Sequence, residues 1–152
     1  MDIIIDTREQ APLCFNQFGG DYIDKIVVEK LDVGDYSCRY KNGHEAKIVF
    51  ERKSLVDLFG TMGKGNRRFK KEIERAHNQN IRLVIVVEGS LKAILRGLSY
   101  SKMKGLTVLR TMFTFWIKYG VSHLFFNNRE DMEKYIYEFY ISYGNVMGKD
   151  NV

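Results

Sequence analysis

Short apolar runs separated by turn residues dominate the first fifty residues of the chain. Residues 2–6 (DIIID) predict a short buried strand bounded by acids, and Gly19-Gly20 indicates a turn. Three further strands are predicted, beginning at Ile26, within residues 32–40 and at residues 46–51. The dipeptide Asn42-Gly43 is a strong hairpin signal between the last two runs. We therefore expect residues 25–51 to form an antiparallel meander.

The hydrophobic period changes from that of strands to that of helices after residue 51. Ser54-x-x-Asp57 resembles a capping box and predicts the start of a short helix. In the following segment Phe69, Ile73 and Ala76 recur at i, i+4 and i+7, which predicts one apolar stripe on an otherwise basic helix.

The second half of the chain alternates between strand and helix patterns. Residues 81–89 are continuously apolar and β-branched, as expected for a buried central strand. Further elements are predicted as a short helix capped by Ser90, a helix over roughly 102–119, a strand at 121–127 and a helix from Arg129 to Tyr143. Antiparallel strands followed by alternating strands and helices indicate an α/β fold, with a mixed central sheet flanked by helices on both faces.

Composition narrows the class of protein. The 152 residues fit one domain, and 45% hydrophobic and 28% charged residues are typical of a globular chain. No apolar run approaches the ~18 residues of a membrane helix, and the acidic N-terminus does not resemble a signal peptide. Cys14 and Cys38 lack metal-type spacing, so we expect reduced cysteines and an intracellular, cytoplasmic protein. The net charge is +5, and six of the twelve residues from Lys64 to Arg75 are basic, which predicts a local basic face.

Acidic residues at the ends of predicted strands form the first chemical signal. Asp35 and Glu51 lie at similar distances on either side of the Asn42-Gly43 turn, so they are predicted to be cross-strand neighbours. Lys53 follows Glu51 by two residues and points to the same face of a continuing strand. Carboxylates at one edge can hold Mg²⁺, and a lysine beside them can position water or stabilise negative charge. These groups meet the requirements of metal-dependent phosphodiester hydrolysis.

The wider pattern resembles the XPF-type structure-specific endonucleases, a branch of the PD-(D/E)xK nucleases. Gly34-Asp35, Glu51-Arg52-Lys53 and Asp57 match the G-D-x(n)-E-R-K-x-x-x-D signature. The similarity continues in residues 5–12 (IDTREQAP), 63–76 (GKGNRRFKKEIERA) and 98–112 (LSYSKMKGLTVLRTM), and covers roughly residues 2 to 140. It implies a single nuclease domain with a restriction-endonuclease-like core.

The resemblance also implies a role for each residue of the signature. Asp35 and Glu51 would bind Mg²⁺ or Mn²⁺, with the backbone carbonyl of Arg52 as a further ligand, and Lys53 would be the catalytic lysine. Asp57 would support this cluster from the following helix.

Residues of the N-terminal D-x-R-E element are implied to assist. Asp6 and Glu9 would lie near the metal and serve a second ion. Arg8, together with Arg52, would order the acids or contact a phosphate.

Each residue also has a simpler structural explanation. Asp35 after Gly34 is a common turn acid, and Glu51 and Lys53 would form an ion pair where a strand reaches solvent. Asp57 would complete the capping box with Ser54, and that role is compatible with the catalytic one. The basic run would be a solvated helix face.

DNA is the implied partner. The family usually carries a tandem helix-hairpin-helix module after the nuclease domain, and no such module is recognised before Val152. We therefore expect DNA contacts from the basic segment, which contains Lys64, Arg67, Arg68, Lys70 and Lys71. Glu72 stands where the family usually has Gln, four residues after Arg68, so its role is left open.

Two apolar segments near the C-terminus bear on assembly. Residues 108–117 (VLRTMFTFWI) predict a helix buried on more than one side, and residues 135–143 carry four tyrosines and a phenylalanine. Thick core packing and a dimer interface both explain these segments, and we predict a homodimer through the C-terminal helices.

The function predicted from the sequence is cleavage of DNA by a metal-dependent endonuclease that acts at branched, flap or fork structures in repair or recombination. The alternatives are a non-cleaving DNA-binding or scaffolding subunit, and a nuclease of the same superfamily used in restriction or junction resolution. The intact acids and Lys53 disfavour the subunit, and the extended E-R-K-x-x-x-D signature disfavours the other nuclease roles.

Overall fold

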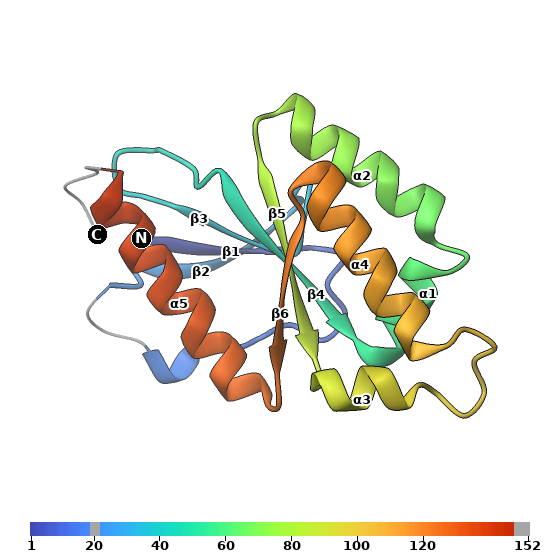
Figure 1. Ribbon diagram of the computed structural model, residues 1–152. Coiled ribbons are helices and arrows are strands. Elements are labelled where there is room, and N and C mark those ends of the chain that lie inside the picture. The colour runs from blue at the N-terminus through green and yellow to red at the C-terminus, as the bar shows by residue number, and fades with distance from the viewer. Residues whose placement is uncertain (19–21, 148–152) are drawn as a thin grey trace.

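A computed structural model describes residues 1–18 and 22–147 of the chain (Figure 1). The elements are β1 (Asp2–Asp6), a 3₁₀ turn (Asn16–Phe18), β2 (Lys25–Glu29), β3 (Tyr36–Arg39), β4 (Ile48–Ser54), α1 (Leu55–Met62), α2 (Asn66–Asn78), β5 (Arg82–Glu88), α3 (Leu91–Arg96), α4 (Gly105–Tyr119), β6 (Ser122–Phe126) and α5 (Arg129–Val146). The turn predicted at Gly19-Gly20 lies outside the described residues. None of the helices in these residues is long and apolar enough to cross a membrane.

Six strands form one mixed sheet in the order β2-β1-β3-β4-β5-β6. β1 pairs in parallel with β2 and antiparallel with β3, while β4, β5 and β6 are parallel to one another. The predicted meander is therefore wrong in one respect, because β1 lies between β2 and β3. Ile3 and Ile4 of β1 are fully buried, which requires an interior strand, whereas Val28 of β2 is 66% exposed at the sheet edge.

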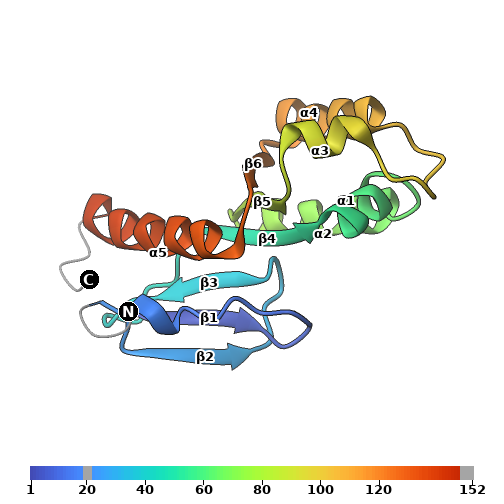
Figure 2. The ribbon, with the colours of Figure 1, turned by 90° about the horizontal axis from the view of Figure 1, so that it is seen from below.

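Helices cover both faces of the sheet, so the predicted α/β architecture is confirmed. α1 to α4 pack on one face, around a cluster that contains Val49 of β4, and α5 packs on the other, around a cluster that contains Phe50 (Figures 1 and 2). Successive side chains of β4 thus point to opposite faces, as the strand period requires. Glu51 and Lys53 follow Val49 toward the α1–α2 face, and Arg52 follows Phe50 toward the other.

The helices that follow β4 begin as their sequences predict. The Ser54 hydroxyl accepts a hydrogen bond from the Asp57 backbone N–H at 3.1 Å and caps α1. Phe69, Ile73 and Ala76 form the buried stripe of α2, which leaves its basic residues on the surface. This arrangement positions Lys53, at the end of β4, beside the polar side of α2.

The two apolar C-terminal segments behave differently. In α5 most of the aromatic run packs against the core, although Tyr135 is exposed; Tyr140 is fully buried and its hydroxyl donates to the Tyr36 carbonyl at 2.9 Å. The prediction that α4 is buried on more than one side is wrong. α4 buries one stripe, and the large apolar side chains exposed on it are Leu106, Phe113, Trp116, Ile117 and Tyr119.

Candidate active site

The turn before β3 fixes the position of Asp35. Gly34 has a φ of 74°, and a Cβ there would lie 2.9 Å from Val49 Cγ2, so only glycine fits. The Asp35 N–H then donates to the Phe50 carbonyl at 2.8 Å. Because Tyr36 pairs with Phe50 in the antiparallel register, Asp35 lies opposite Glu51. The neighbouring positions expected for these two acids are thereby found.

Asp35 is held by the strand that carries Glu51. Its carboxylate accepts a hydrogen bond from the Arg52 backbone N–H at 2.7 Å. Burial and the nearby charge of Glu51 nevertheless raise the pKa of Asp35 from 3.8 to about 8. The site therefore concentrates negative charge that the surrounding protein does not fully compensate.

Lys53 provides the partner of Glu51. Its Nζ lies 2.5 Å from Glu51 Oε1, and only 6% of the Glu51 residue is exposed. Burial raises the pKa of Glu51 in spite of this ion pair. Burial alone would lower the pKa of Lys53, but the charge of Glu51 outweighs it and raises that pKa, so the amine is held as an ammonium.

The donor set fits a hard divalent cation. Asp35 and Glu51 offer carboxylate oxygens, and the raised pKa of each acid reflects burial together with charge that a cation would offset. Within residues 1–18 and 22–147, no group of three or more His, Cys, Asp or Glu side chains has the geometry of a metal site. A cation held by this pair would have to complete its shell with water, backbone or substrate oxygens, as Mg²⁺ commonly does.

Asp6 and Arg8 form an ion pair apart from Asp35 and Glu51, and protein donors already hydrogen-bond the Asp6 carboxylate. The Asp6 carboxylate accepts from Arg8 Nε at 2.7 Å, from the Arg8 backbone N–H at 2.7 Å and from the Leu31 N–H at 2.6 Å. Burial would raise the pKa of Asp6, but these hydrogen bonds outweigh it and lower that pKa. Binding of a second ion by Asp6 would have to displace protein donors.

Glu9 and Arg52 are joined on the face of β4 away from Lys53. Arg52 Nε and Nη2 contact the two Glu9 oxygens at 2.8 and 2.6 Å, and Nη1 contacts Glu88 at 3.1 Å. Burial would raise the pKa of Glu9, and the bonds from Arg52 outweigh it and lower that pKa. The guanidinium therefore joins β4 to β5 and to the segment that follows β1, and it is not directed at a phosphate.

Asp57 has the capping role that the sequence offered as one of two. Its Oδ2 accepts from the Ser54 hydroxyl at 2.7 Å, in addition to the bond made by its own backbone N–H. Asp57 also lines a hollow of about 450 Å³ between α1 and α2, to which Lys53, Arg68 and Glu72 contribute. The hollow gives an approach from the basic helix to Lys53.

Glu72 is the site residue whose role the sequence left open. Its Oε1 accepts a hydrogen bond from the Gly34 N–H at 3.1 Å, which joins α2 to the turn before Asp35. Its charge contributes to the raised pKa of both Glu51 and Lys53. The only signal in the sequence was its place four residues after Arg68, one helical turn along the same side of α2.

The basic residues expected to contact DNA are all exposed. They are Lys64, Arg67, Arg68, Lys70 and Lys71. Within the described part of the chain, no hydrogen bond or ion pair engages these five side chains. Arg68 alone of the five lines the hollow that contains Lys53, so it lies between the basic surface and the acidic cluster.

Comparison with known proteins agrees with this architecture. A family model of the ERCC4 domain matches residues 5–139. The structure is similar to that of XPF from Aeropyrum pernix, with a TM-score of 0.67 and 17% identity, over 90% of this chain and 61% of that chain. A structure of XPF from Aeropyrum pernix in complex with DNA matches with a TM-score of 0.67 and 18% identity, over 90% of this chain and 62% of that one. The chain thus spans about three fifths of these structures. A comparison with curated protein sequences found no match.

Proposed function

Because this chain belongs to the ERCC4 domain family, we propose that it is a Mg²⁺- or Mn²⁺-dependent endonuclease that hydrolyses DNA phosphodiesters at branched, flap or fork structures in repair or recombination. One observation carries the proposal: two largely buried carboxylates, Asp35 and Glu51, face each other on the neighbouring chain segments of β3 and β4 in the middle of the sheet, and Lys53 forms an ion pair with Glu51 at 2.5 Å. A buried like-charge pair is costly to a fold, so it favours a functional over a structural explanation.

Asp35 and Glu51 are the residues that would hold the divalent ion. When bound, such an ion supplies an activated water and offsets the negative charge that develops on the phosphoryl oxygens. The Arg52 N–H orients the Asp35 carboxylate, and the clamp of Arg52 with Glu9 and Glu88 fixes that segment of β4. These contacts keep the carboxylates in position before substrate binds, which lowers the reorganisation needed for catalysis.

Lys53 would act on the scissile phosphate. Its ammonium is retained by Glu51, and its side chain extends along the wall of the hollow that Arg68 and Asp57 also line. A phosphate entering between α1 and α2 would therefore meet a fixed positive charge. Lys53 would stabilise the charge on the phosphate and position the attacking water.

The exposed basic residues of α2 and its N-terminal turn would bind the DNA backbone. They carry no internal ion pairs in the described chain, so their charges are available to phosphates. XPF from Aeropyrum pernix has been observed in complex with DNA, which supports DNA as the ligand of this chain. Contacts of this kind favour sequence-independent binding.

A homodimer is the proposed assembly, and the exposed apolar face of α4 supports it more than α5 does. The exposed rings of Phe113 and Trp116 pack against the buried His123 of β6, with centroids 5.4 and 5.2 Å from its ring, beside the outer strand of the sheet. The His123 Nδ1 is buried without a hydrogen-bond partner among the described residues. A second copy covering this face would bury the exposed apolar side chains.

The experiment that tests the function is a metal-titrated cleavage assay on a flap, a fork, a four-way junction, a nicked duplex and a plain duplex. Metal-dependent cuts near the branch support the proposal. Tight binding to the same DNAs without cleavage at any Mg²⁺ or Mn²⁺ concentration supports the non-cleaving subunit instead.

A further inference from the structure

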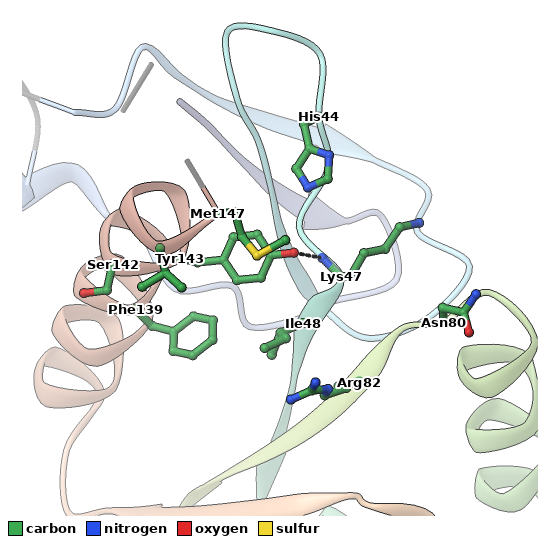
Figure 3. A pocket seen from close by; sticks show the side chains of 10 residues that line it. His44, Lys47, Ile48, Asn80, Arg82, Phe139, Ser142, Tyr143 and Met147 are labelled. Carbon is green, nitrogen blue, oxygen red and sulfur yellow. Dashed lines mark hydrogen bonds between the residues drawn. The ribbon is translucent and has the colours of Figure 1, made fainter. Parts of the chain in front are cut away.

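A second hollow, of about 470 Å³, lies between the C-terminal half of α5 and the first residues of β4 and β5 (Figure 3). Ile48, in its wall, is at the opposite end of β4 from Lys53. The two residues are five positions apart along the strand, roughly 17 Å. The hollow also opens on the α5 side of the sheet, whereas Lys53 faces α1 and α2. It is therefore distinct from the candidate active site.

The charged side chains among the described residues that line this hollow are all positive. Lys47 and Arg82 are exposed, and no Asp or Glu is among the described residues that line it. Neither cation makes a side-chain hydrogen bond or ion pair within the described chain. A lining with two unpaired cations and no acid among its described residues favours an anionic ligand.

Flat aromatic surface lies beside these charges. The Tyr143 hydroxyl accepts the Lys47 N–H at 3.0 Å, as the dashed line in Figure 3 marks, so its ring is held in place. The rings of Tyr143 and His44 are nearly parallel, with an interplanar angle of 16°. Phe139 of α5 and Met147, the residue that follows α5, contribute to the apolar lining. A preformed aromatic and thioether surface suits a planar ring.

His44 supplies a polar group that the protein leaves unused. Its Nε2 is buried without a hydrogen-bond partner among the described atoms, and Figure 3 shows its ring above Tyr143 and Met147. Buried nitrogens of this kind are normally paired, and a ligand in the hollow would satisfy it once the His44 ring turns toward the ligand. The hollow thus combines cationic, aromatic and hydrogen-bonding groups.

We infer that this hollow binds one nucleotide unit, with the base against Tyr143 and Met147 and the phosphate at the cationic rim to which Lys47 and Arg82 contribute. A free nucleotide and a nucleotide within single-stranded DNA share this chemistry. Neither source depends on the proposed cleavage reaction, because binding is measured in a chelating buffer in which no metal-dependent cutting occurs.

The test is titration calorimetry of the whole chain with thymidine 5′-monophosphate, thymidine, inorganic phosphate and a ten-nucleotide thymidine strand. We expect the monophosphate to bind at least about tenfold more tightly than thymidine or phosphate alone, because only it contacts both parts of the site. Lys47→Ala/Arg82→Ala should weaken this binding about tenfold or more, and Met147→Glu, which adds an acid at a position that is 47% exposed, should do the same.

The matched control is Lys30→Ala/Lys118→Ala, which removes the same charge from residues that do not line the hollow. Its binding of the monophosphate should stay within about twofold of the parent. Loss of strand affinity in the Lys47/Arg82 variant, beyond that in the control, identifies single-stranded DNA as the source. Retained strand affinity with lost monophosphate affinity identifies a free nucleotide. Equal weakening of monophosphate binding in both double variants, or no binding to the parent chain, would overturn the inference.

Discussion

Glu72 Oε1 accepts a hydrogen bond from the Gly34 N–H at 3.1 Å, across 38 positions of sequence. The bond ties α2 to the left-handed turn that precedes Asp35, and the same carboxylate adds negative charge near Glu51 and Lys53. Glu72 therefore has two separable effects on the site, one through its acceptor oxygen and one through its charge. Glutamine, the residue usual at this place in XPF-type nucleases, would retain only the first.

Substitutions at Glu72 should separate these effects. Glu72→Gln keeps the acceptor for Gly34, so its free energy of unfolding should change by less than about 0.5 kcal/mol, whereas Glu72→Ala should lose about 1–2 kcal/mol. Loss of charge should weaken Mg²⁺ binding several-fold in both variants. Chemical denaturation and calorimetric Mg²⁺ titration measure the two effects. Equal stability of the Gln and Ala variants would contradict the positioning role.

Asp35→Asn should stabilise the metal-free protein at neutral and alkaline pH. The folded-state pKa of Asp35 is raised from 3.8 to about 8 by burial first and by Glu51 second, so the folded state favours the protonated acid. Stability is then lost as the pH rises between about 4 and 8, because the unfolded chain ionises there first. Asparagine keeps an acceptor for the Arg52 N–H and cannot ionise.

At pH 8 in a chelating buffer, Asp35→Asn should increase the free energy of unfolding by about 1–3 kcal/mol. This is less than the full pKa difference implies, because the ionisation of Asp35 depends on that of Glu51. Thermal denaturation from pH 4 to pH 9 measures it. Added Mg²⁺ should narrow the difference by stabilising the parent chain alone. A variant less stable than its parent at pH 8 would contradict this view of the acidic pair.

The basic residues of α2 should fall into two kinds, those that only bind DNA and those that also affect its cleavage. Lys71→Ala should weaken DNA binding and reduce the slope of log affinity against log salt by about 0.9. It should have little effect on the rate at which bound DNA is cleaved. Arg68→Ala should do the same and also lower the single-turnover rate, because Arg68 lines the hollow with Lys53. Anisotropy at several salt concentrations and single-turnover cleavage separate the two. Identical single-turnover rates for both variants would exclude a role for Arg68 beyond binding.

The exposed face of α4 should control assembly. Ile117 is 84% exposed, so Ile117→Asp should leave the monomer fold intact and weaken association. Tyr100→Asp, at a position that is 71% exposed away from α4, is the matched control. Sedimentation velocity should find a dimer for the parent and the control and a monomer for Ile117→Asp. A monomeric parent chain at every concentration would refute the dimer.

Much of the fold follows from local patterns, while strand partners do not. The stripe of Phe69, Ile73 and Ala76 predicts α2 because helical periodicity records which side is buried. The run at Ile26 predicts a strand but not its neighbour, since β1 and β2 pair in parallel through a connection that carries no hairpin signal. The prediction that α4 is buried on more than one side fails for a different reason. The number of apolar residues on a helix does not show whether the core of the same chain covers all of them.

The site shows the same division between local and distant information. Asp35 and Glu51 could be paired by counting from the Asn42-Gly43 turn, because one hairpin register relates them. The engagement of Asp6 by Arg8 and of Glu9 by Arg52 could not be predicted, since it depends on side-chain directions at the ends of three strands. Glu72 reaches the turn before Asp35 only because α2 packs over β4, a tertiary relationship without a sequence spacing of its own.

We propose above all that Asp35 and Glu51 form the metal-binding pair of a DNA endonuclease. The most direct test is single-turnover cleavage of a flap substrate in saturating Mg²⁺ by the parent chain, Asp35→Asn and Glu51→Gln, with DNA affinity and folding measured in parallel. Both variants should fold and bind DNA as the parent does, and should cleave at least about 1000-fold more slowly, which corresponds to about 4 kcal/mol of transition-state stabilisation. Cleavage by either variant at the parental rate would contradict the account.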